Sequence, residues 1–126
     1  MIADSLKSIL LVGSGSFIGG AARYLVSVLM KGVGKGFPWA TLTVNLVGCF
    51  LIGLLWGWLS RSSQLDSNLS LFLMVGLCGG FTTFSTFSKE ALMLLQNGSL
   101  WNFAIYVAAS IVAGILCVAG AYLITK

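Results

Sequence analysis

The sequence predicts an all-α membrane protein with four transmembrane helices, of which the third is broken near its centre. The 126 residues are 58% hydrophobic and only 8% charged, whereas a soluble domain is roughly 25% charged. The chain contains four apolar runs, each close to the roughly 20 residues that cross a bilayer. Two adjacent glycines followed by two β-branched residues interrupt the third run, which makes a continuous helix unfavourable there.

The first run covers residues 9–30 and ends in a Gly- and Lys-bearing loop before Pro38. Lys7 precedes this run and small residues lie within it, so a cleaved signal peptide is a competing interpretation, although the run continues beyond those residues. The other three runs are expected at residues 41–59, 69–95 and 101–124. Since the runs and their connections nearly exhaust the chain, we expect one four-helix transmembrane domain over residues 1–126.

Several classes of function are excluded by what the sequence lacks. The chain has no His, so it cannot hold a His-containing catalytic triad, an imidazole metal site or a His proton relay, and we expect no enzyme. Cys49, Cys78 and Cys117 lie far apart within apolar runs and form no CxxC pair, which is typical of packing residues. The net charge of +4 is scattered along the chain, so no nucleic-acid partner is expected.

The basic residues leave the orientation in the membrane weakly specified. Four spans place both termini on one side, where three basic residues are expected: Lys7, Arg61 and Lys126. The opposite side holds two to four, namely Lys31 and Lys35, with Arg23 and Lys89 near that end of their spans. Either the chain inserts in both orientations, so that two copies pair antiparallel, or a single strongly placed charge decides the orientation.

Small residues recur at a four-residue spacing that permits close helix contact. The pairs are Gly15 and Gly19, Ser16 and Gly20, Gly53 and Gly57, Gly76 and Gly80, and Ser110 and Gly114. They predict a tight bundle without identifying a partner.

Polar residues within apolar spans are costly and therefore mark either structural contacts or a functional path. For Arg23, near the end of the first span, snorkelling to the interface or capping a neighbouring helix end is favoured as a structural role. Asn45 has hydrogen-bond donors for an anion, although tying two helices together is slightly favoured as its role. On a helix, Thr83, Thr86 and Glu90 would form one stripe, beside a second stripe of phenylalanines that more often indicates packing.

The interruption of the third run between Gly79 and Ser88 is the most discriminating feature. Unwound backbone in a membrane is tolerated only where it is buried or lines a cavity, and its carbonyls can then coordinate a cation the size of sodium. The alternative is a simple kink that Ser and Thr hydroxyls repair.

Three segments of the chain resemble the Fluc, or CrcB, family of fluoride channels. They are Gly79-Gly80-Phe81-Thr82-Thr83-Phe84-Ser85-Thr86-Phe87-Ser88 with Glu90, then Thr41-Leu42-Thr43-Val44-Asn45-Leu46-Val47-Gly48, and Gly19-Gly20-Ala21-Ala22-Arg23-Tyr24. The resemblance covers essentially the whole chain, with the motifs in the expected order. It implies an antiparallel, dual-topology homodimer of four-helix subunits with two fluoride pores.

The resemblance also implies the roles of individual residues. Phe84 and Phe87 would line the pores, and Asn45 would contact the ion path. Ser85, Thr86 and Glu90 would form a polar route, and Tyr106 and Ser110 resemble the family's pore-side positions in the fourth span. A structural sodium ion at the dimer centre would be held by the backbone carbonyls of Gly79 and Thr82. One turn beyond Ser110, where some members carry a hydroxyl, this chain has Gly114.

The function expected from these observations is passive, fluoride-selective export of cytoplasmic fluoride across a prokaryotic plasma membrane. Fluoride is strongly hydrated, so a pore must replace its water with hydrogen-bond donors, and the positive edges of aromatic rings can contribute. A proton-coupled multidrug-type exporter is the alternative, but such proteins are expected to carry a carboxylate in the first span, and none lies between Asp4 and Asp66. A non-conducting membrane assembly subunit is a third possibility.

Overall fold

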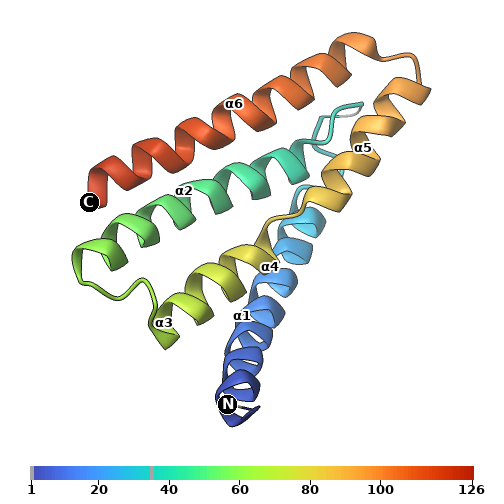
Figure 1. Cartoon of the computed structure of the whole chain (residues 1–126). Coiled ribbons are helices and arrows are strands. Elements are labelled where there is room, and N and C mark those ends of the chain that lie inside the picture. The colour runs from blue at the N-terminus through green and yellow to red at the C-terminus, as the bar shows by residue number, and fades with distance from the viewer. Residues whose placement is uncertain (1, 35) are drawn as a thin grey trace.

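The computed structural model describes residues 2–34 and 36–126. Their regular structure is helical (Figure 1), and four helical spans are long and apolar enough to cross a membrane. Three of them are the single helices α1 (Ile2–Leu29), α2 (Trp39–Arg61) and α6 (Leu100–Thr125). The chain is therefore a multi-pass membrane protein.

The third span consists of several pieces between Asn68 and Gln96. Helix α3 (Asn68–Ser70) leads into the π-helical segment η1 (Leu71–Cys78), the short helix α4 (Gly79–Phe81) and helix α5 (Phe84–Gln96). Between α4 and α5 the backbone is extended, with ψ of 159° at Thr82 and φ of −148° at Thr83.

The helical geometry of the third span continues through Gly79 and Gly80 and ends after Phe81. Within the segment from Gly79 to Ser88 where the sequence predicted the break, Gly79 and Gly80 keep helical geometry, and the extended residues are Thr82 and Thr83. The π-helical segment before them was not anticipated. Gly80 serves for close packing against α1, whereas a Cβ atom at Gly79 would have no neighbour closer than 3.9 Å.

Helix α1 packs tightly against the first part of the third span through small residues on both sides. A Cβ atom at Gly80 would lie 2.6 Å from the carbonyl oxygen of Ser16, and one at Gly76 would lie 2.9 Å from that of Val12. Gly15 and Gly19 of α1 face the backbone of η1 and α4 in the same way. Because any side chain at these places would separate the two backbones, the spacing of small residues determines this contact.

Helices α2 and α6 lie side by side (Figure 1), and α5 packs on α6. Gly53 faces Val118, and Gly57 faces Tyr122 one turn further along, so the two helices run in the same direction. The main buried cluster joins residues of α2, α5 and α6: Leu42, Ala91, Leu94 and the fully buried Tyr106. This packing holds α5 at a fixed place beside α2 and α6.

Helix α1 begins at Ile2, well before the start expected near residue 9. Asp4 lies in its first turn, where a carboxylate favours the positive end of the helix dipole. The other three spans extend one or two residues beyond each expected boundary.

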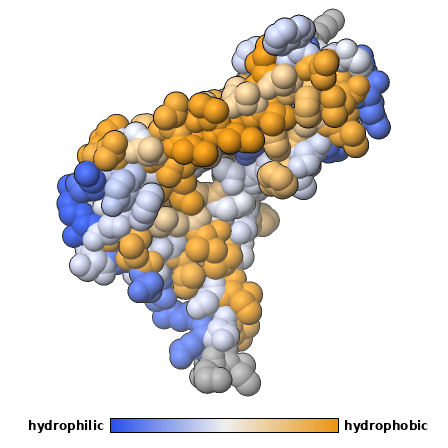
Figure 2. All heavy atoms as spheres, turned by 45° about the horizontal axis from the view of Figure 1, so that its top comes forward, coloured by the Kyte–Doolittle hydropathy of each residue, from blue (hydrophilic) through white to orange (hydrophobic). Residues whose placement is uncertain are grey.

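Large apolar side chains cover much of the outer surface. Phe17 of α1 and Phe84 of α5 are each 79% exposed. Figure 2 shows broad hydrophobic areas along the helices, while hydrophilic residues gather towards the ends of the molecule. Lipid or another apolar surface must cover these faces, as expected for a membrane protein.

The close contact between α1 and the third span predicts a position-specific effect of adding one methyl group. In Gly19→Ala the new Cβ would overlap the Leu77 carbonyl oxygen, so we expect the free energy of unfolding to fall by about 1–3 kcal/mol. Gly20→Ala is the matched control because its Cβ would have no neighbour closer than 4.0 Å. Thermal unfolding of both variants in mild detergent measures the difference, and equal unfolding midpoints would contradict the packing described.

Candidate functional site

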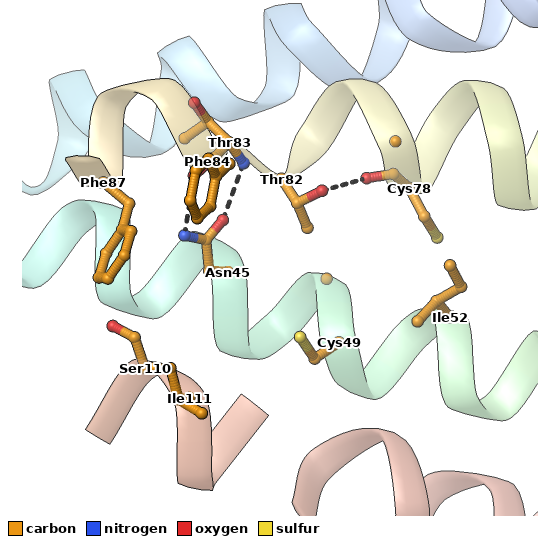
Figure 3. Close-up of a pocket in the computed structure, with 12 residues that line it drawn as sticks. Asn45, Cys49, Ile52, Cys78, Thr82, Thr83, Phe84, Phe87, Ser110 and Ile111 are labelled. Atoms are coloured by element: carbon orange, nitrogen blue, oxygen red, sulfur yellow. Dashed lines mark hydrogen bonds between the residues drawn. The ribbon is translucent and has the colours of Figure 1, made fainter. Parts of the chain in front are cut away.

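A cavity of about 360 Å³ lies between α2, the third span and α6 (Figure 3). It brings together six of the predicted site residues: Asn45, Gly79, Thr82, Phe84, Phe87 and Ser110. The residues predicted to bind the cation therefore share one cavity with four of the predicted pore residues. The cavity adjoins the extended residues, which places unwound backbone where a membrane protein tolerates it.

Asn45 binds the extended backbone through both ends of its amide group (Figure 3). Its Nδ2 donates to the Thr83 carbonyl oxygen at 3.1 Å, and its Oδ1 accepts from the Thr83 amide at 2.8 Å. The sequence left two roles open for Asn45, and the structure shows that it ties α2 to the third span. The second hydrogen on Nδ2 is left over from this pairing and is a potential donor to a ligand.

The hydroxyl groups of the two threonines repair part of the broken hydrogen-bond ladder. The Thr83 hydroxyl accepts from the Thr86 amide at 3.2 Å and so caps the start of α5. The Thr82 hydroxyl donates to the Cys78 carbonyl oxygen at 3.0 Å, to which the Thr82 amide also donates. Hydroxyl repair, expected as the alternative to unwinding, therefore accompanies the extended backbone.

Two carbonyl groups at the interruption lose their usual helical donors. In a continuous helix the amides of Thr83 and Thr86 would bind the carbonyls of Gly79 and Thr82. Those amides bind Asn45 and the Thr83 hydroxyl instead. The carbonyls of Gly79 and Thr82, which the resemblance assigns to sodium, therefore lack these helical donors.

The donor set at this place suits a hard cation rather than a soft one. Among residues 2–34 and 36–126, no group of three or more His, Cys, Asp or Glu side chains is arranged to hold a metal ion. Carbonyl oxygens, by contrast, are suitable ligands for alkali cations. Gly79 and Thr82 are therefore the candidate ligands in the described part of the chain.

Arg23 caps the end of α4. Its Nε donates to the Gly80 carbonyl oxygen at 3.3 Å, so the structure shows capping of a neighbouring helix end rather than snorkelling. A cation at this position also complements the negative end of the helix dipole. Arg23, Thr83 and Thr86 border a second, smaller cavity of about 140 Å³.

Three aromatic rings form a row from the cavity into the buried cluster. The ring centroids of Phe84 and Phe87 are 5.9 Å apart, and those of Phe87 and Tyr106 are 5.0 Å apart. Both pairs are tilted, so ring edges as well as faces are presented to the neighbours. Phe84 is largely exposed, which leaves one side of its ring free for another molecule.

The polar residues of the predicted route lie in different surroundings. Tyr106 is fully buried, and its hydroxyl donates to Oε1 of Glu90 at 3.3 Å. Glu90 lies outside both cavities, and Ser85 is exposed. The Ser110 oxygen is buried beside the larger cavity without a hydrogen-bond partner among the described residues.

Sequence reasoning missed the residues that complete the wall of the larger cavity. Cys49, Ile52 and Cys78 line it, although the cysteines were interpreted only as packing residues. The spacing of Asn45, Cys49 and Ile52 is i, i+4, i+7, which places them on one face of α2 and could have identified them.

Comparison with known proteins finds a matching family model and several relatives that share one name. A family model described as CrcB-like protein, Camphor Resistance (CrcB), matches residues 10–122. A protein of Chlorobium phaeobacteroides named fluoride-specific ion channel FluC is 47% identical over 114 residues, or 90% of this chain and 89% of the relative. Proteins of the same name from Agrobacterium fabrum and Azobacteroides pseudotrichonymphae are 47% identical over 112 residues and 42% identical over 122 residues, respectively. These two alignments cover 88% of this chain and 90% of the relative, and 96% of this chain and 98% of the relative.

The pairing of Asn45 with Thr83 predicts how readily the Thr83 amide exchanges its hydrogen. In Asn45→Ala the amide loses its acceptor, so we expect exchange at this position to accelerate by roughly tenfold. Asn45→Asp keeps an acceptor oxygen and should show a smaller acceleration. Ser110→Ala, which lines the same cavity without binding the interruption, is the control. Hydrogen exchange followed by mass spectrometry of peptides covering residues 79–88 tests this, and unchanged exchange in Asn45→Ala would contradict the pairing.

Proposed function

The chain belongs to the CrcB family, and we propose that it is a fluoride-selective ion channel through which cytoplasmic fluoride leaves the cell passively. The family is one of ion channels rather than enzymes. The observation that carries the proposal is the cavity that gathers Asn45, Ser110 and the rings of Phe84 and Phe87. These groups are hydrogen-bond donors and aromatic edges, which suit an anion without trapping it.

Fluoride entering the cavity would exchange water for several weak contacts. The free hydrogen of the Asn45 amide and the Ser110 hydroxyl are neutral donors, and the Phe84 and Phe87 edges carry partial positive charge. Conduction requires sites that replace hydration yet release the ion. A full positive charge at the same place would hold fluoride more strongly, and Arg23 is already engaged with the Gly80 carbonyl.

The channel is proposed to be an antiparallel homodimer with two pores. The nearly balanced distribution of Lys and Arg favours insertion in both orientations. The exposed ring of Phe84 adjoins the cavity, so a second copy would close the side that this chain leaves open. The broad apolar faces of the helices provide surface for such pairing.

A sodium ion is proposed to bind the carbonyl groups of Gly79 and Thr82. Two carbonyl oxygens from one chain do not complete the coordination of an alkali cation, and a second copy would supply two more. When bound, the ion supplies positive charge near the interruption and thereby favours anions in the neighbouring cavity. Asn45 and the Thr83 hydroxyl keep the two carbonyls available by engaging the competing amides.

Beyond the cavity, Thr86, Ser85, Glu90 and Tyr106 are proposed to lead fluoride towards the membrane edge. The Tyr106 hydroxyl donates its one hydrogen to Glu90, so the hydroxyl groups of Ser85 and Thr86 would supply the donors on this segment. In a plasma membrane that is negative inside, outward movement of one anion gains about 2.3 kcal/mol per 100 mV. Export therefore requires no other energy source.

Efflux from liposomes that contain only the purified protein tests the proposed function. We expect rapid fluoride loss with little chloride loss, without a proton gradient, when a potassium ionophore balances the charge. Phe84→Ile removes an aromatic edge at the cavity and should reduce fluoride efflux by at least about tenfold, by analogy with losing one good polar contact. Fluoride- and chloride-selective electrodes measure both rates.

Phe17→Ile is the matched control because Phe17 has the same exposure as Phe84 but lies on α1, away from the cavity. Its efflux should equal that of the unmodified protein. If well-folded protein gives no fluoride efflux, the channel proposal is overturned and an assembly subunit is favoured. Flux that requires a proton gradient would favour an exporter.

A further inference from the structure

The wall of the larger cavity contains a thiol group that the proposed conduction mechanism does not use. Cys49 follows Asn45 by one turn on the same face of α2, and both residues line the cavity (Figure 3). Opposite them, α6 presents Ser110 and Ile111 to the same cavity. A thiol is a weak hydrogen-bond donor.

Position 114 of α6 lies directly against this thiol. Gly114 is buried, and a Cβ atom built there would lie 3.4 Å from the Cys49 sulfur. No other described atom outside the helix's own backbone lies within 4 Å of that point. The sulfur of Cys49 therefore occupies the space beside a residue that has no side chain of its own.

Ser110 lies one turn before Gly114 on the same face of α6. Its oxygen is buried at the cavity and has no partner within the described residues. Buried hydroxyl groups normally have hydrogen-bond partners, so this group marks a place where a ligand or water is expected to bind. On the facing helix α2, Asn45 and Cys49 line the same cavity and also carry hydrogen-bond donors.

We propose that the Cys49 thiol is a donor that lines the fluoride path next to Ser110 and takes the place of a polar side chain at position 114. This inference rests on the proposed channel function. It assigns the continuation of the path to α2 instead of α6. Cys78 also lines the cavity, but it is only 2% exposed, so its thiol is less available to an ion.

The proposal is tested by separating the donor function of Cys49 from its packing. Cys49→Ala removes the thiol and should lower fluoride efflux from liposomes by roughly fivefold, the effect of one modest hydrogen bond. It also vacates the space beside position 114. Adding Gly114→Ser to Cys49→Ala places a hydroxyl there and should restore most of the efflux.

Adding Gly114→Ala to Cys49→Ala fills the same space without a donor and should leave efflux low. Cys117→Ala removes a thiol that does not line the cavity and should leave efflux unchanged. Cys49→Ser keeps a donor of similar size and should remain within roughly twofold of the unmodified protein. This variant keeps the test informative if Cys49→Ala does not fold.

Three results would overturn the inference in protein that remains monodisperse. They are unchanged efflux in Cys49→Ala, equal rescue by Gly114→Ala and Gly114→Ser, or strong loss of efflux in Cys49→Ser. The first excludes a role in the path, and the other two assign Cys49 to packing. If the unmodified protein itself carries no fluoride, the proposed function fails instead.

Discussion

Backbone amide and carbonyl groups within a membrane must find partners inside the protein, and the extended residues Thr82 and Thr83 interrupt the helical bonds that would provide them. The surrounding helices meet this requirement with specific groups. Asn45 of α2 binds both backbone groups of Thr83, and Arg23 of α1 binds the carbonyl of Gly80. Glycines let α1 approach the third span closely enough for such contacts. The interruption is therefore stabilised from both neighbouring helices.

The same arrangement connects the interruption to the proposed function. By occupying the amides of Thr83 and Thr86, the neighbouring groups leave the carbonyls of Gly79 and Thr82 without their usual donors. Because α5 starts immediately afterwards at Phe84, the orientation of this aromatic ring depends on how the extended residues are held. Asn45 thus links the cavity, the candidate cation ligands and the first aromatic residue of α5.

The sequence predicted the helical class and the four spans because long apolar runs allow few alternatives in a membrane. It also identified Asn45, Phe84 and Phe87, which share a cavity. The extended residues Thr82 and Thr83 lie inside the segment from Gly79 to Ser88 where the sequence predicted the interruption. Helix propensity does not reveal which of these residues leave the helix, nor that Gly80 is needed against Ser16. Nor does local sequence reveal which hydroxyl will be left unpaired, as at Ser110, because this depends on how α2 and α6 pack. Pairing with a second copy depends on surfaces that one chain leaves exposed.

The central claim is that the carbonyls of Gly79 and Thr82, which lose their helical donors at the extended residues, bind a cation between two oppositely oriented copies. A high-resolution structure of the protein in lipid with sodium tests this most directly. We predict antiparallel copies with an ion bound by the Gly79 and Thr82 carbonyls of both, and with Asn45 bound to Thr83 in each. A continuous helix across Thr82 and Thr83, or copies that share one orientation, would contradict the account.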